Sequence, residues 1–189
     1  LTMGITDALA AIAAGNSVVI KPDQQTPFST IWAVALLEEA GLPPGVANVI
    51  TGEGSKLGEP IVDNVDYLMF TGSTEVGRLL STQCAERLIE CSMELGGKNA
   101  MLVLPDAKLE KTVNGTLIAA FSSAGQLCIA MERIYVHRPI YEAFVDRLAE
   151  RLSQLKLGGD LGWGIDVGPL ISQKQLERMS AHVDDAVAN

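Results

Sequence analysis

The chain has 189 residues, 48% of them hydrophobic, and a mean hydropathy of +0.23, which allows a sizeable buried core and argues against intrinsic disorder. Its formal net charge of −9 argues against nucleic acid or an anionic membrane surface as a partner. No apolar run is long enough to cross a bilayer, and the N-terminal residues lack the basic region of a signal peptide, so we expect a cytoplasmic protein. The three cysteines have no regular spacing, which predicts neither a disulfide framework nor a metal site.

In the first half of the chain, short β-branched runs alternate with helix-like segments. Helices are predicted over residues 5–14, 29–40 and 74–87, and a glycine-rich loop at 52–64 leads into a further short helix. Strands are predicted at SVVIKP, VANVIT, DYLMFTG and RLIECSMELGG. Strands separated by helices at this spacing indicate βαβ units and a parallel sheet, so the predicted fold class is α/β.

The second half repeats this alternation after the glycine pair Gly96–Gly97. NAMLVLP and RIYVH are predicted strands, and helices are predicted over 109–121, from 140 to about 155, and from residue 173 onward, with a looser stretch at 156–170. The glycine pair is the best predicted domain boundary, giving domains at 1–96 and 97–189, although it could equally be a turn inside one domain. Neither end of the chain carries a helix-capping signal, so we expect a fragment of a longer protein.

The sequence FTGSTEVG, residues 70–77, follows a predicted strand and opens a predicted helix. Backbone N–H groups at such a position can bind an anion, and Gly72 would let a phosphate approach while Ser73 and Thr74 donate hydroxyls. Gly77 would permit close packing of the helix on the sheet. An ordinary strand-to-helix turn with a serine cap is an equally good interpretation, because the spacing is not the dinucleotide fingerprint.

Three further residues could carry chemistry, and each has a plainer interpretation. Lys21 lies at a predicted strand end, where ligands of open parallel sheets bind, but it could be a solvated lysine. Glu94 ends an apolar strand, where a raised pKa would suit a general base, or it could be structural. Cys128 follows a glycine turn and could be held as a thiolate, whereas a lone cysteine is more often buried, as we expect for Cys84 and Cys91.

Four motifs occur in the order and spacing of the aldehyde dehydrogenase superfamily: AAGNSVVIKPDQQTP, FTGSTEVG, MELGGKNAMLVLPDA and AGQLCIAMERIYVH. The resemblance covers essentially all 189 residues. It implies the second part of a cofactor domain with an open, parallel, Rossmann-like sheet, followed by the first part of an α/β catalytic domain. In that family the glutamate of E-L-G-G-K is the general base and the cysteine of G-Q-x-C is the nucleophile, roles that carry over to Glu94 and Cys128.

The chemistry of this family suits these residue types. A thiolate adds to an aldehyde carbonyl, hydride loss to a nicotinamide leaves a thioester, and water activated by Glu94 releases the acid. Folding must then bring the Cys128 sulfur and the Glu94 carboxylate to opposite sides of one pocket. The resemblance also implies an oxyanion donor from a P-W-N asparagine upstream of Leu1, so we expect no dehydrogenase activity from these 189 residues alone.

The resemblance further implies a cofactor and its contacts. In NAD-preferring relatives a glutamate follows Lys-Pro-x, and here that position is the neutral Gln24. With Lys21 nearby, a 2′-phosphate should be tolerated, so we expect NADP, with NAD as the alternative. The expected cofactor-binding residues are Lys21, Gln24, Gly52, Thr71, Gly72, Ser73, Gly77 and Leu95.

The sequences CSMELGGKNAMLVL, ERIYVH and AHVDDAVA are most similar to those of bacterial succinate-semialdehyde dehydrogenases, which implies succinate semialdehyde as the substrate. In many of those enzymes two arginines bind the substrate carboxylate, but Thr6 and Ser122 occupy these two positions here. Some relatives also have a second cysteine near the nucleophile, and Ala130 occupies that position here. Another aliphatic or aromatic aldehyde is therefore the alternative substrate, and a non-catalytic nucleotide-binding fragment is the alternative function. Members usually pair through the helix at 76–87, so we expect a homodimer or homotetramer.

Overall fold

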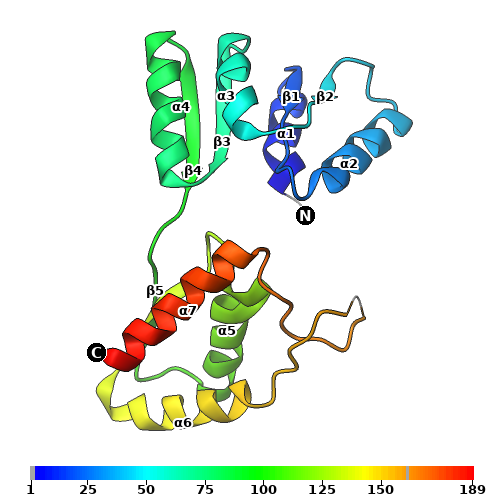
Figure 1. The fold of residues 1–189 in the computed structure, drawn as a ribbon. Coiled ribbons are helices and arrows are strands. Elements are labelled where there is room, and N and C mark those ends of the chain that lie inside the picture. Colours follow the sequence, from blue (N-terminus) through cyan, green and yellow to red (C-terminus); the bar gives the residue numbers. More distant parts are fainter. Residues whose placement is uncertain (1–2, 161) are drawn as a thin grey trace. The chain divides into compact units, whose positions relative to one another are not determined.

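The computed structural model describes residues 3–160 and 162–189 (Figure 1). The chain divides into two compact units, Leu1–Gly96 and Gly97–Asn189, and each has a hydrophobic core of its own. The division falls between the two glycines singled out in the sequence. The assignment of cofactor binding to the first unit and of catalysis to the second stays a prediction.

The first unit alternates helices and strands along its whole length. Two helices end at glycines in the left-handed region, Gly15 with φ 90° and Gly41 with φ 102°, where a side chain would be strained. The predicted loop at 52–64 is wrong in extent: a helix begins at Gly54, because the backbone carbonyl of Glu53 accepts hydrogen bonds from Lys56 and Leu57. The elements are α1 (Met3–Ala13), β1 (Val18–Ile20), α2 (Pro27–Glu39), β2 (Ala47–Val49), α3 (Gly54–Asp63), β3 (Tyr67–Gly72), α4 (Thr74–Glu86) and β4 (Glu90–Leu95).

Every named strand pairs in parallel, as the βαβ pattern predicts. Within the described residues the strands pair only in twos, however: β1 with β2, β3 with β4, and β5 (Asn99–Val103) with β6 (Met131–Val136). The predicted α/β class with open parallel sheets is therefore confirmed, and within the described residues each sheet has two strands. Hydrophobic periodicity reports which residues are buried, and it carries no information on which strand lies beside which.

The core of the first unit lies between α3, α4 and the β3–β4 pair (Figure 1). Because successive strand side chains point to opposite faces, one set of residues on β3 and β4 packs on the helices and the alternate set faces away. The buried members of this core are Val62, Leu68, Leu80 and Cys84, and the partly buried Ile61, Phe70, Ile89, Cys91 and Met93 pack against them.

The second unit has the element order β5, α5 (Leu109–Phe121), β6, α6 (Tyr141–Leu152) and α7 (Gln173–Ala188), with single 3₁₀ turns at Ser122–Gly125 and Arg138–Ile140. Helix α5 packs on β6 and on α6, and Val103, Val113 and Phe144 form the buried core. An ion pair on the surface links α5 to α6, since Arg147 binds both carboxylate oxygens of Glu110. Among the described residues, no helix is both long and apolar enough to cross a membrane.

Candidate active site

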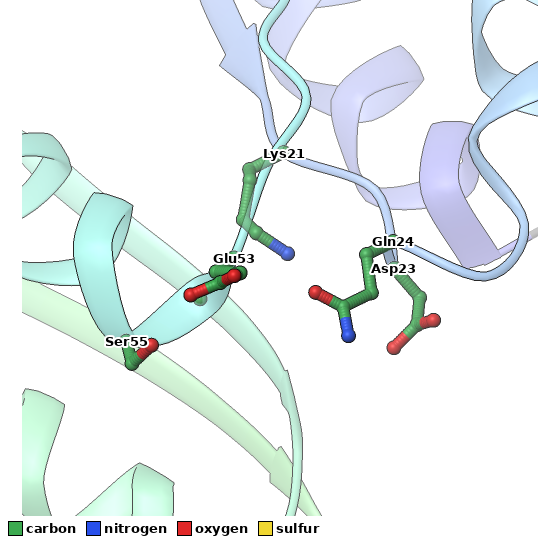
Figure 2. Close-up of a pocket in the computed structure, with 6 residues that line it drawn as sticks. Lys21, Asp23, Gln24, Glu53 and Ser55 are labelled. Carbon is green, nitrogen blue, oxygen red and sulfur yellow. The ribbon is translucent and has the colours of Figure 1, made fainter.

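An open hollow of about 440 Å³ lies at the carboxyl ends of β1 and β2 (Figure 2). The two strands are paired in parallel, so the loops that follow them meet at one edge, which is where α/β proteins bind ligands. Lys21 follows β1 directly, and its ammonium group points into the hollow between Glu53 and Gln24. The lining consists of Lys21, Asp23, Gln24, Glu53, Gly54 and Ser55.

The groups around this hollow include several hydrogen-bond donors and the carboxylates of Asp23 and Glu53. Helix α3 begins at Gly54, so unpaired backbone N–H groups of its first turn and the hydroxyl of Ser55 are available as donors. A Cβ added at Gly54 would stand 4.0 Å from the Lys21 ammonium nitrogen. Glu53 brings a negative charge, but its carboxylate pairs with Lys56 at 3.0 Å. The hollow therefore presents an ammonium group, N–H groups and a hydroxyl beside two carboxylates, and its role in binding the cofactor stays a prediction.

Gly52 occupies the turn that leads into this helix. Its φ of 148° lies in the region that favours glycine, and a Cβ there would come 3.0 Å from Leu57. The role of Gly52 is therefore to let the chain turn from β2 into α3.

The FTGSTEVG turn joins β3 to α4, and the hydroxyls of Thr71 and Ser73 make hydrogen bonds within the first unit. Ser73 caps α4 by accepting a hydrogen bond from the Val76 N–H at 3.3 Å, which is the plainer of the two interpretations of this turn. Thr71 donates to Asp7 of α1 at 3.4 Å. The space beside Gly72 holds the Phe70 ring, since a Cβ at Gly72 would lie 2.5 Å from Cζ of Phe70.

Glu94 lies on β4, and its side chain is exposed. Apolar surroundings were expected for this carboxylate, and this unit does not provide them. The reason is strand parity: Cys91 and Met93 pack on the core, so Glu94 projects from the opposite face, where it pairs in register with Thr71 of β3. Because Glu94 and Cys128 belong to different units, the pocket expected to hold both stays a prediction.

The three cysteines lie in different environments. Cys84 is buried on α4, Cys91 is partly buried on β4, and Cys128 is exposed. Burial raises the pKa of the Cys84 thiol, and the neighbouring Cys91 raises it further. The interpretation of Cys84 and Cys91 as core thiols is supported, and Cys128 is not a core residue.

Cys128 sits on a turn that directly follows a strained segment of backbone. The turn is closed by a hydrogen bond from the Ala130 N–H to the Leu127 carbonyl at 3.0 Å. Just before it, Ser123 and Ala124 have φ values of 52° and 56°, a region that costs a residue with a side chain about 1 kcal/mol or more. Strain of this kind persists only where surrounding contacts determine the backbone.

Two side-chain amides supply such contacts. Nδ2 of Asn99, the first residue of β5, donates to the carbonyl oxygens of Cys128 at 2.7 Å and of Ala130 at 3.0 Å. Gln126 donates through Nε2 to the Ser123 carbonyl at 2.9 Å and accepts through Oε1 from the Ile171 N–H at 2.9 Å. The segment before β6 is thereby tied to β5 and to the loop that precedes α7.

Sequence reasoning missed several of these residues. Glu53 and Ser55 follow a predicted strand and open a helix, so strand-end position could have indicated them. Gln126 lies inside the GQLC motif, but its bond to Ile171 depends on a long-range approach. Asn99 follows the ELGGK motif, yet no local pattern shows that its amide reaches residues 29 and 31 positions further on.

The full length of the chain, residues 1–189, matches the model of the aldehyde dehydrogenase family. The chain belongs to the aldehyde dehydrogenase family. It is 48% identical over 188 residues to a Mycolicibacterium smegmatis protein that bears the provisional name succinate-semialdehyde dehydrogenase with NADP(+) as cofactor, a match covering 100% of this chain and 36% of that protein. It is 42% identical to the glutarate-semialdehyde dehydrogenase of Pseudomonas putida, over 94% of this chain and 38% of that protein.

A solved structure supports the same fold. The aldehyde dehydrogenase of Bacillus cereus, determined as an NAD+ complex, superposes with a TM-score of 0.87 at 40% identity. The match covers 93% of this chain and 36% of that one. The aldehyde dehydrogenase chain described here thus spans little more than a third of the length of these family members.

Proposed function

We propose that this chain contributes the nucleophile, the general base and part of the cofactor site of an NAD(P)-dependent aldehyde dehydrogenase. The observation that carries the proposal is the contrast among the cysteines. Cys128 alone of the three is exposed. It sits on a turn that the Asn99 amide holds and that follows two residues with strained backbones, Ser123 and Ala124. A buried structural thiol needs no such arrangement, whereas a nucleophile needs both access and a defined direction.

In the proposed reaction, the sulfur of Cys128 adds to the aldehyde carbon and the carbonyl oxygen becomes an oxyanion. The Cys128 backbone N–H lies next to that oxygen and is one donor for it. A bound nicotinamide would supply the acceptor for the hydride. Glu94 then takes a proton from a water molecule that attacks the thioester, and the acid leaves as the Cys128 sulfur is released. Exposure of Glu94 on its strand face leaves the carboxylate accessible to that water.

The hollow between Lys21 and Ser55 is the proposed site for the adenosine ribose and its substituent. Lys21 and the first turn of α3 favour negative charge, and Gln24 can donate a hydrogen bond. The carboxylates of Asp23 and Glu53 would repel a 2′-phosphate, and the ion pair of Glu53 with Lys56 weakens this repulsion. We propose NADP as the preferred cofactor and NAD as the alternative, in keeping with relatives whose names and titles include both.

Succinate semialdehyde is the proposed substrate, and the semialdehyde of another dicarboxylic acid is the alternative that the relatives favour. The names of these relatives include succinate semialdehyde and glutarate semialdehyde, which differ by one methylene group. A hydrophobic pocket discriminates between substrates that differ by one methylene by about 10- to 200-fold in kcat/KM. The kcat/KM of a full-length protein that carries this sequence, measured for both aldehydes, decides between them. A higher value for a different aldehyde class would overturn both.

Pairing through α4 is the proposed route to a homodimer. Val76 and Leu79 are one turn apart on this helix, and their side chains are 42% and 58% exposed. Arg87, which follows the helix, is exposed and donates to the Val62 and Val65 carbonyls. Sedimentation of the Leu79→Glu variant against wild type tests this contact.

Cysteine labelling tests the catalytic proposal against a purely nucleotide-binding role. Limiting iodoacetamide followed by peptide mass spectrometry should modify Cys128 first and Cys84 last. The Cys128→Ala variant should then lose oxidation of the aldehyde while retaining binding of the cofactor. Equal inertness of all three cysteines, with cofactor binding intact, would instead support a non-catalytic module.

A further inference from the structure

The side chain of Asn99 connects the turn that carries Cys128 to the neighbouring strand β5. Its amide nitrogen has two hydrogens, and they bind the carbonyl oxygens of Cys128 and Ala130 at 2.7 and 3.0 Å. The first of these carbonyls belongs to the nucleophile itself. Any rotation of the Cys128 backbone that turns the carbonyl away breaks this hydrogen bond.

The strand pairing explains why Asn99 reaches the turn. Asn99 pairs with Met131 and Ala100 with Arg133, so β6 has one extra residue at this point. A bulge of this kind bends the strand and redirects the side chains next to it. The neighbouring Lys98 is engaged elsewhere, since it pairs with Glu132, the extra residue.

The segment from Ser123 to Ala130, which ends in this turn, needs restraint because its first residues have an unfavourable backbone conformation. Ser123, Ala124 and Gly125 are three consecutive residues with positive φ, and only the last is a glycine. Gln126 restrains the start of this segment through Ser123 and Ile171. Asn99 restrains its end, at Cys128 and Ala130, immediately before β6.

We propose that Asn99 is a positioning residue for Cys128: its amide holds the Cys128 and Ala130 carbonyls and so keeps the sulfur in the orientation required for attack. This inference rests on the proposed function, in which Cys128 is the nucleophile. Asn99 acts through the backbone and takes no part in proton or hydride transfer.

The decisive variants are Asn99→Asp and Asn99→Ser in a full-length protein that carries this sequence. Asp has the shape of Asn but places an acceptor against two carbonyl oxygens, so both hydrogen bonds are lost. Ser keeps one donor on a shorter side chain. Asn48→Asp is the matched control, because the Asn48 amide also donates to two backbone carbonyls, those of Val18 and Gly45.

Four quantities are measured for each variant: the rate of Cys128 alkylation without cofactor, kcat and KM for the aldehyde, and Tm. We expect Asn99→Asp to lower kcat by more than about tenfold and to slow alkylation severalfold, since misplacement by about 1 Å can cost about a hundredfold. Asn99→Ser should lie between Asp and wild type. Asn48→Asp should lower Tm at most, with alkylation and kcat within about twofold of wild type.

The results separate this inference from the function on which it rests. If wild-type Cys128 labels no faster than Cys91 and no aldehyde is oxidised, the proposed function fails. If wild-type Cys128 is reactive and both Asn99 variants alkylate and turn over normally, the positioning role is wrong. The positioning role is equally wrong if the Asn99 variants lower Tm but leave the alkylation rate and kcat unchanged. If the Asn99→Asp variant does not fold, Asn99→Ser still allows this comparison.

Discussion

Gly77 of α4 lies directly against Leu95 of β4: a Cβ added at Gly77 would stand 2.7 Å from Cδ2 and 3.2 Å from Cδ1 of Leu95. The contact joins the FTGSTEVG and ELGG motifs, which are separated in the sequence and packed together in the first unit. Leu95 also follows Glu94, the proposed general base. The missing side chain at Gly77 therefore sets how closely α4 approaches the strand that carries this carboxylate.

Gly77→Ala is expected to destabilise the protein by up to about 2 kcal/mol. The added methyl group overpacks the contact, at a cost of about 1–3 kcal/mol, and this outweighs the helix propensity of about 1 kcal/mol that alanine gains over glycine. Urea denaturation gives the difference in the free energy of unfolding. A gain in stability would show that Leu95 moves aside freely.

The matching test is the same substitution in a Leu95→Ala background. With the leucine methyl groups gone, Gly77→Ala should become neutral or stabilising by up to about 1 kcal/mol, because only the helix propensity remains. The coupling energy between the two sites should then be about 0.5–3 kcal/mol. Additive effects would mean that the two residues do not touch.

Leu88→Gly is expected to raise stability by about 0.5–1 kcal/mol. Leu88 has a φ of 58° and a side chain that is 93% exposed, and it ends α4 with hydrogen bonds from its own N–H to Ala85 and from the Ile89 N–H to Cys84. This helix end favours glycine. Relief of about 1–2 kcal/mol of left-handed strain exceeds the entropy cost of about 0.5–1 kcal/mol that glycine brings.

Thermal unfolding measures this effect, and Leu9→Gly in α1 is the control. Leu9 is also exposed, but it lies within a regular helix, so glycine there should lower Tm. A lower Tm for Leu88→Gly as well would contradict the left-handed conformation at Leu88.

The order of elements could be predicted from the sequence because it depends on local patterns. Gly15 and Gly41 end helices as their sequence context indicates, and Ser73 caps α4. Features that depend on distant parts of the chain could not be predicted. Leu88 gives no local sign of its positive φ.

In the candidate site, too, the features that depend on local motifs could be predicted and those that depend on distant contacts could not. Cys128 and Glu94 were found from motifs, whereas the exposure of Glu94 follows from the packing of β4 on α4. The hydrogen bonds of Asn99 follow from the pairing of β5 with β6 and its bulge. Hydrophobic patterns determine which face of a strand is buried, but partners across a sheet depend on the register of the whole unit.

The stability of the protein should fall as the pH rises above about 8.5, the ordinary pKa of a cysteine, and Cys84 should account for part of this fall. Cys84 is fully buried, and burial raises its pKa in the folded state. Between the unfolded and folded pKa values, the unfolded chain has lost the proton while the folded chain keeps it. Raising the pH therefore favours unfolding, and this contribution to stability is complete only below the unfolded pKa.

Urea denaturation at a series of pH values from 7 to 10 measures this dependence. Cys84→Ala lowers stability at every pH because it leaves a cavity, but its stability should fall less steeply with pH than that of the wild type. Parallel curves for the two proteins would show that Cys84 is not the titrating group. The same buried thiol should be the last of the three to react with iodoacetamide, since only the thiolate is nucleophilic.

Gln24→Glu is expected to shift cofactor preference from NADP towards NAD by about 10- to 100-fold in the ratio of kcat/KM values. Gln24 lines the hollow with Lys21 and Ser55, and a carboxylate there would repel a 2′-phosphate while still accepting hydrogen bonds from ribose hydroxyls.

Gln25→Glu is the matched control: the same charge is added one residue further on, at a position outside the lining of the hollow. If repulsion at the hollow decides the preference, the first variant loses activity with NADP and the second keeps the wild-type ratio, because an exposed charge further away is screened by solvent and salt. Equal shifts in both variants would mean that net charge alone is responsible, and no shift in either would place the 2′-phosphate away from Gln24.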